Sequence, residues 1–170
     1  MSEIDIEIQI KIPLQEFLKN TNEKEIKNKA IINAFYKELA QLRMRAVAKL
    51  LATDLEYWFH GPPHCQHMMR VLTGQAHRSE FRFEPRSVEV IGDCVIAEGW
   101  EGAQAYWVHV WTLKNGVITQ FREYFNTWLT IEDISPEHRW EIGQGSTHTL
   151  WQSHPRDLYN RSLPGLLLAI

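Results

Sequence analysis

Three short turn signals divide the second half of this chain into extended runs, and they constrain the fold more than any other feature. They are Gly92-Asp93, Gly102-Ala103 and Asn115-Gly116. Asn-Gly between two extended runs is the strongest short-range hairpin signal, because such turns need positive φ at both central residues. From Glu80 onward the sequence therefore predicts an antiparallel meander.

The residues before this meander show helical periodicity. Asn22-Glu23-Lys24-Glu25 has the pattern of a capping box that opens a helix, and apolar residues recur at helical spacing from there to Thr53-Asp54. A strand-like run follows over residues 55–60, Gly61-Pro62-Pro63 ends it, and a short helix is expected over 64–72. Helices followed by a meander predict an α+β domain with helices on one face of a curved sheet.

The first dozen residues alternate strictly between isoleucine and polar residues, from Ile4 to Ile12. A period of two predicts a half-buried strand, which Pro13 ends. The expected organisation is an N-terminal appended strand and linker over residues 1–20, a core over 21–130, and an irregular extension over 131–170 that packs on the core.

The bulk properties narrow the class of protein. A chain of 170 residues suits one domain with a real core, and a formal charge of -3 without a basic stripe argues against a nucleic-acid partner. No apolar run approaches the length of a membrane span, and the N-terminus lacks the pattern of a signal peptide. Two cysteines fit a reducing compartment, so the expected location is the cytoplasm.

Two-residue turns also predict which residues share a face of the sheet. With Lys114 opposite Val117 and Glu101 opposite Gln104, one face would carry ionisable and phenolic groups among tryptophans. If that face formed a dimer interface, the apolar opposite face would lie beneath the helices. The members of the polar face are Glu98, Trp100, Trp107, His109, Trp111, Arg122, Tyr124 and Asn126. Such a face can line a small-molecule cavity or form a dimer interface, and both interpretations stay open.

An acid–base site is the sharpest hypothesis for this face. His109 would accept a proton, Glu98 would orient it, and Tyr124 or Trp107 would donate to a developing oxyanion. A hydrogen-bonded network that only specifies packing is the alternative. The candidate ligand-binding residues are Trp58, His60, His67, Trp100, Trp107, Trp111, Arg122 and Asn126.

A second cluster, around the double proline, combines His60, His64, His67 and Cys65. These are ligand types that zinc uses. However, no carboxylate is close in sequence, and the spacing matches no common metal motif. We therefore expect neither a metal nor a cofactor.

Several motifs resemble the plant wound-induced protein family. They are Trp58-Phe59-His60-Gly61-Pro62-Pro63, Met68-Met69-Arg70, Leu72-Thr73-Gly74, the runs 107–112, 116–127 and 150–153, and the ending 164–170. The similarity covers most of the chain after about Ala30. That family resembles the NTF2-like superfamily, which includes ketosteroid isomerase and SnoaL-type polyketide cyclases. The resemblance implies a cone, often dimeric, in which a curved antiparallel sheet wraps around a long helix.

One position departs from the pattern that the resemblance implies. Enzymes of the SnoaL-like branch commonly carry an aspartate where Asn126 stands, and asparagine cannot accept a proton at neutral pH. An acid–base enzyme would have to use His109, Glu98 or His60 instead. We expect a homodimer that binds a small apolar or aromatic molecule in its conical pocket, and isomerase, cyclase or dehydratase activity stays open. The alternative is a non-catalytic dimeric scaffold of a stress or wound response.

Overall fold

The computed structural model describes residues 3–75, 81–102, 105–125, 150–154 and 166–170. Its elements, in chain order, are α1 (Glu3–Ala40), α2 (Met44–Leu50), β1 (Leu51–His60), the 3-10 turn η1 (Pro63–Cys65), α3 (His67–Leu72), β2 (Pro85–Ile91), β3 (Cys94–Glu101), β4 (Ala105–Lys114), β5 (Val117–Phe125), β6 (Leu150–Gln152) and β7 (Leu167–Ala169).

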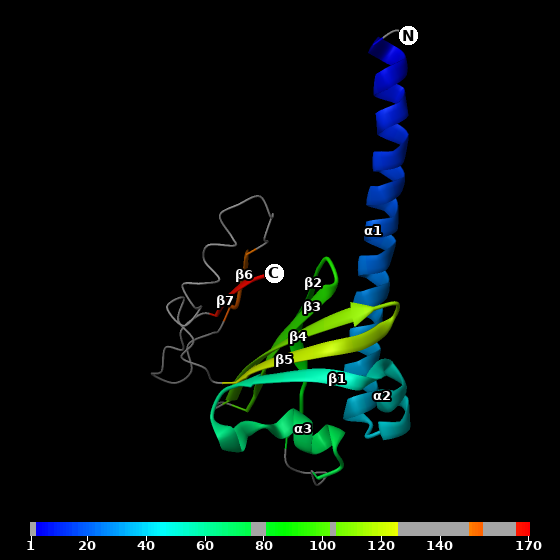
Figure 1. Ribbon diagram of the computed structural model, residues 1–170. Helices are drawn as coiled ribbons and strands as arrows, with labels where there is room; N and C mark the ends of the chain where they lie inside the picture. The colour runs from blue at the N-terminus through cyan, green and yellow to red at the C-terminus, as the bar shows by residue number, and fades with distance from the viewer. Residues whose placement is uncertain (1–2, 76–80, 103–104, 126–149, 155–165) are drawn as a thin grey trace.

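Five of these strands form one sheet, in the order β1-β5-β4-β3-β2. Strands β2 to β5 are a continuous antiparallel meander, as the turn signals predicted. Strand β1 pairs with β5 in the parallel direction, so the helical N-terminal half enters the sheet at its edge. The predicted α+β class, with helices against a curved sheet, is confirmed (Figure 1).

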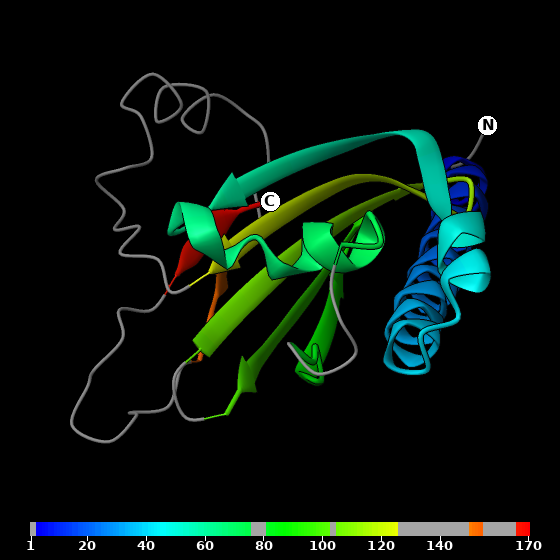
Figure 2. The ribbon, with the colours of Figure 1, turned by 90° about the horizontal axis from the view of Figure 1, so that it is seen from below.

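The main core lies between the helices and one face of this sheet, which we call the helix face. Figure 2 shows α3 on this side of the sheet and α1 crossing at one end. The core is mostly aromatic and fully buried at its centre. Its largest fully buried side chains are Trp107, Trp111, Phe35, Phe121, Phe125 and Ile32.

The opposite face, which we call the outer face, is covered by the C-terminal hairpin of β6 and β7. Trp151, Leu166 and Leu168 of this hairpin pack on apolar side chains of β3, β4 and β5. Strands β6 and β7 pair only with each other among the described strands, so side chains rather than a backbone ladder hold the hairpin on the sheet.

The N-terminal strand predicted for the isoleucine alternation is wrong, because residues 3–40 form the single helix α1. A lone strand needs a neighbour to satisfy its backbone groups, whereas a helix satisfies its own. The capping box predicted at residues 22–25 is also wrong, since α1 runs through them. Two of its residues instead contact the β2–β3 turn: Lys24 Nζ lies 2.5 Å from Asp93 Oδ1, and Glu25 Oε1 accepts the Gly92 N–H at 3.2 Å.

The predicted register around Gly102 is wrong by one residue. Glu101 pairs with Ala105 rather than with Gln104, so three residues connect β3 and β4. A one-residue shift moves every side chain of a strand to the other face. Glu98 and Trp100 consequently lie on the outer face, and Ala97 is the residue of β3 opposite His109.

The turn at Asn115-Gly116 is as predicted, with Lys114 opposite Val117, but a bulge follows it. Leu113 pairs with Ile118 while Thr112 pairs with Gln120, so Thr119 is the extra residue. The bulge allows Ile118 and Phe121, three positions apart, to be buried on the same face. It also places Glu123, rather than Arg122, opposite His109.

Close packing at Gly99 gives a test of the register between β3 and β4. A Cβ there would lie 2.5 Å from Cζ2 of Trp107 and 2.6 Å from the Glu84 carbonyl oxygen. We expect Gly99→Ala to lower the free energy of unfolding by at least about 2 kcal/mol, because the backbone must move. Gly102→Ala is the control: φ there is +60° but a Cβ meets no described atom within 4 Å, so only the left-handed backbone costs about 1 kcal/mol. Equal losses in urea denaturation would contradict the register.

Candidate functional site

A chain of hydrogen bonds runs through the centre of the core and joins α1 to the sheet. The Trp111 indole N–H donates to the Tyr36 hydroxyl at 2.9 Å, and the Tyr36 oxygen lies 2.6 Å from His109 Nδ1. On the other side of the ring, His109 Nε2 lies 2.7 Å from Glu123 Oε2. The Tyr57 hydroxyl donates to the second oxygen of Glu123 at 3.1 Å.

The partners determine where the protons of this chain lie. A carboxylate only accepts, so His109 Nε2 carries the proton that binds Glu123. The Tyr36 oxygen already accepts from Trp111, and its own proton points to the free lone pair of His109 Nδ1. His109 is therefore the neutral Nε2–H tautomer, and both of its nitrogens are engaged.

Burial controls the ionisation of these groups. Burial lowers the pKa of His109, and the hydrogen bond and charge of Glu123 oppose that shift. Burial raises the pKa of Tyr36 well above its usual range, which keeps its hydroxyl a donor. Burial and the nearby Glu123 charge also raise the pKa of Tyr57. The hydrogen-bond chain thus consists of a neutral imidazole and two neutral phenols around one carboxylate.

Five aromatic rings pack around His109. Its ring centroid lies 4.4 Å from that of Trp107, and 4.9 Å from those of Phe83 and Phe121. His109 and Glu123 have no exposed surface. The pair is therefore part of the core, and solvent does not reach it in this conformation.

A cavity of about 600 Å³ lies beside this core, where the end of α1, the start of α2, α3 and the segment before β2 meet. Most of its lining is apolar, and the polar residues are Gln41, Arg82 and Glu84. The lining residues are Leu39, Ala40, Gln41, Leu42, Met44, Val71, Gly74, Phe81, Arg82, Phe83 and Glu84. Phe83 lines this cavity and also packs on His109, so its ring separates the two.

Four of the predicted site residues lie on the helix side of the sheet. Trp107, His109 and Trp111 share one face of β4, as the alternation along the strand predicted, but that face is buried as core beneath the helices. His67, on α3, stacks on Phe81 at 4.5 Å between ring centroids and thus lies next to the cavity wall.

Glu98 is not the partner of His109, because the register places it on the outer face. It is buried there and accepts hydrogen bonds from Ser87 Oγ at 3.1 Å, the Tyr106 hydroxyl at 2.7 Å and the His154 N–H at 3.3 Å. Arg86 adds a contact at 3.5 Å. Glu98 therefore holds the C-terminal segment on the sheet rather than orienting a base.

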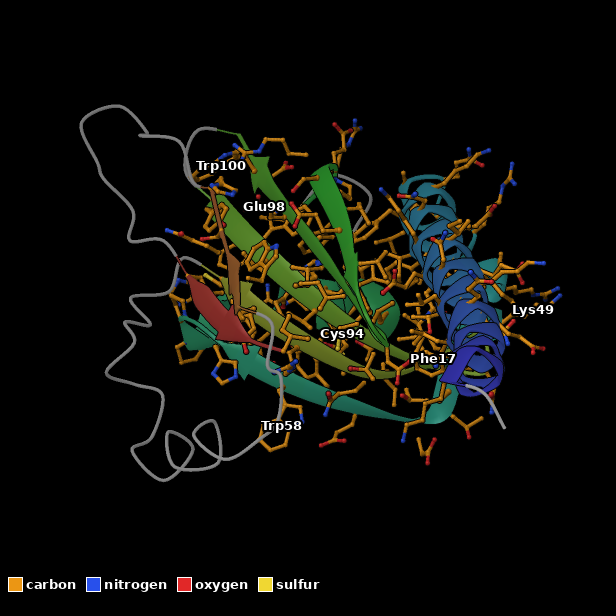
Figure 3. The ribbon with its side chains drawn as sticks, turned by 90° about the horizontal axis from the view of Figure 1, so that it is seen from above. Phe17, Lys49, Trp58, Cys94, Glu98 and Trp100 are labelled. Atoms are coloured by element: carbon orange, nitrogen blue, oxygen red, sulfur yellow. The ribbon has the colours of Figure 1, made fainter. Side chains whose placement is uncertain are left out.

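The remaining predicted residues that the structure describes also lie away from His109. Tyr124 and His60 stack on each other at 4.7 Å on the outer side of β5 and β1, and burial, with Arg122 nearby, lowers the pKa of His60. Trp58 is exposed at the β1 edge of the sheet. Trp100 lies across the sheet from that edge (Figure 3). Arg122 belongs to the same outer side, because it alternates with Phe121 and Glu123. Asn126 lies outside the described residues.

Sequence reasoning missed Tyr36, Glu123 and Phe83. The sequence could have predicted that Tyr36 faces the core, because Tyr36 directly follows Phe35 in the apolar periodicity of α1. Glu123 shares a face of β5 with Phe121 and Phe125, and only the bulge brings that face to His109. The contact between Phe83 and His109 joins segments that no local pattern relates.

Within the described ranges, no three His, Cys, Asp or Glu side chains are grouped so that they could hold a metal ion. Both Cys65 and Cys94 are free thiols. No described helix combines the length and apolar character needed to cross a bilayer.

Comparison with known proteins identifies the family of this chain. The model of the family described as "Wound-induced protein WI12" matches residues 69–170. The chain belongs to this family. His109 and Glu123 lie within the matched part, whereas Tyr36 and Tyr57 precede it.

Named relatives of this wound-induced family member come from plants. The chain is 37% identical over 105 residues to Wound-induced protein 1 of Solanum tuberosum and 43% identical over 110 residues to Senescence associated gene 20 of Arabidopsis thaliana. Each match covers 60% of this chain and 100% of the relative. An NTF2-like protein of unknown function from Burkholderia xenovorans is similar in structure, with a TM-score of 0.48 and 20% identity over 72% of this chain and 98% of that one.

The two tyrosines of the hydrogen-bond chain provide a matched pair of variants. Tyr36→Phe leaves both the Trp111 N–H and His109 Nδ1 without a partner in the core, so we expect a loss of about 2–3 kcal/mol in the free energy of unfolding. Tyr57→Phe removes one bond from Glu123 at a half-buried position and should cost about 1 kcal/mol. Urea denaturation at pH 7 measures both. A larger loss in Tyr57→Phe would contradict the chain of bonds.

Proposed function

We propose that this protein binds a small apolar or aromatic molecule in the cavity between α1, α2, α3 and the segment before β2. The observation that carries the proposal is the cavity itself, whose volume of about 600 Å³ falls in the range of small-molecule sites. Its wall includes two phenylalanines, a methionine, two leucines and a valine, and polar groups are few. Such a lining favours an apolar ligand with few hydrogen-bonding groups.

The polar residues of the wall restrict the ligand further. Arg82 and Glu84 have opposite charges and are both exposed beside the buried Phe83. A ligand with one polar end could leave that end at this charged pair and place its apolar body against Phe81, Phe83 and Met44. We therefore favour an uncharged or weakly polar aromatic molecule over an anion.

The state of His109 argues for binding rather than proton transfer. A general base needs a free lone pair within reach of the substrate. Here Nδ1 accepts from Tyr36, Nε2 donates to Glu123, and Phe83 lies between the ring and the cavity. The hydrogen-bond chain thus supports the wall of the site.

Isomerase- or cyclase-type chemistry is the second candidate, and the His109–Glu123 contact favours it. A histidine oriented by a carboxylate is the pair that proton abstraction uses. For that role Phe83 would have to swing aside and Tyr36 would have to release Nδ1. Glu123 would then take the orienting role that the sequence assigned to Glu98.

A filled cavity tests the binding proposal. Val71→Phe adds a ring to the cavity wall, and we expect it to raise the dissociation constant of a small aromatic probe such as 2-naphthol by about tenfold or more. Val90→Phe is the matched control, because Val90 packs against the same core without lining the cavity. Calorimetry measures binding, after thermal-shift screening of apolar and aromatic compounds for a tighter ligand.

Two outcomes would contradict the proposal. The first is equal affinity in Val71→Phe and the parent protein, which would place the ligand elsewhere. The second is the absence of binding by every compound of the panel. His109→Gln separates the candidates: it should abolish turnover of a bound substrate if His109 is a base, and it should leave any turnover in place if His109 only supports the cavity wall.

A further inference from the structure

Two rows of side chains cross the outer face at its β1 edge, and they bring together residues that the cavity does not use. In the first row, Trp58 of β1 stands beside Arg122 of β5, and Val110 of β4 follows. In the second row, His60 stands beside Tyr124, and their rings stack with centroids 4.7 Å apart and an angle of 8° between the planes. We define the edge cluster as Trp58, His60, Arg122 and Tyr124.

The C-terminal hairpin reaches the border of the edge cluster but does not cover its β1 side. The hairpin packs on β3, on β4 and on Tyr124, and none of the described residues in that apolar group comes from β1. Trp58 is 51% exposed, and Figure 3 shows it at the β1 edge, across the sheet from Glu98 and Trp100. A ligand can therefore reach the Trp58 ring from solvent.

Arg122 is the charged member of the edge cluster, and the described part of the chain does not neutralise its charge. Its side chain is half-buried, yet none of the described ion pairs includes its guanidinium. Its Nε is buried and has no hydrogen-bond partner among the described residues. A buried donor without a partner costs stability, and in native proteins such a group calls for a ligand, ion or water that completes it.

The groups around Arg122 leave its charge uncompensated. Glu56, two residues before Trp58 on the same side of β1, accepts the Trp58 indole N–H at 2.8 Å. Burial, with the charge of Arg122, lowers the pKa of His60, so the imidazole is neutral at pH 7. Burial also raises the pKa of Tyr124, which keeps the phenol neutral. One guanidinium therefore stands among three neutral aromatic rings.

The chemistry of the edge cluster fits a small aromatic anion. A guanidinium presents its N–H donors in a planar fork that matches the two oxygens of a carboxylate. The exposed Trp58 ring beside it offers a surface on which an aromatic ring of the ligand can stack. A nucleic acid would need several unpaired basic side chains, whereas Arg86 on the same face already contacts Glu98 at 3.5 Å. A singly charged carboxylate also suits one guanidinium better than a doubly charged phosphate does.

We propose that the edge cluster is a second ligand site, separate from the cavity, and that it binds an aromatic carboxylate. Arg122 binds the carboxylate, the Trp58 ring stacks on the aromatic body, and the stacked rings of His60 and Tyr124 form the adjoining wall. The cavity lies on the helix side of the sheet and the edge cluster on the outer side. The two sites therefore differ in place and in ligand charge.

Calorimetric titration with 2-naphthoate tests this site. We expect Arg122→Gln to raise the dissociation constant about tenfold or more, because hydrogen bonds to a charged group are lost. Trp58→Ala, at an exposed position that the fold does not need, should raise it about threefold or more. Arg45→Gln is the matched control, since Arg45 is exposed on α2 and the substitution removes the same charge away from the edge cluster. Thermal unfolding checks that each variant is folded.

The cavity variant separates this site from the first one. Val71→Phe should leave the affinity for 2-naphthoate unchanged, and Arg122→Gln should leave the affinity for 2-naphthol unchanged. A loss of 2-naphthoate binding in Val71→Phe but not in Arg122→Gln would place the carboxylate in the cavity and overturn the proposal. It is equally overturned if the parent protein does not bind 2-naphthoate at millimolar concentration, if Trp58→Ala and Arg122→Gln bind like the parent, or if Arg45→Gln loses as much affinity as Arg122→Gln.

Discussion

The packing of α1 on the sheet depends on the carboxylate of Glu123, which is buried without any exposed surface. A buried carboxylate is costly unless hydrogen bonds replace the water that it has lost. Here His109 and Tyr57 supply those bonds, and His109 is held in turn by Tyr36 from the helix. Removal of any member leaves a polar group unsatisfied in an aromatic core, so this hydrogen-bond chain joins helix and sheet at the centre of the core.

This arrangement exists because of one extra residue in β5. The bulge at Thr119 places Phe121, Glu123 and Phe125 on the helix face and brings Glu123 opposite His109. Without it, Arg122 would stand there. A single backbone irregularity thus decides whether His109 meets a carboxylate or a guanidinium.

The sequence predicted the meander and its turns because turn residues act locally. It assigned His109 a carboxylate partner but chose Glu98, since neither the bulge nor the longer connection after Glu101 leaves a clear mark in the pattern. The isoleucine alternation misled for a related reason: a period of two predicts a strand only where another strand lies beside it. The sequence thus predicted features that depend on neighbouring residues, such as the turns. It did not predict which distant segments pair with each other.

In this structure His109 is a neutral, structural member of the hydrogen-bond chain, with its proton on Nε2. The most direct test is the 15N chemical shifts of the His109 ring in labelled protein between about pH 5 and pH 8, assigned by the signal lost in His109→Gln. We expect the Nε2–H tautomer at neutral pH, and protonation of the ring only below the ordinary histidine range, because burial lowers the pKa of His109. A proton on Nδ1, or titration near the ordinary histidine pKa of about 6.5, would contradict it.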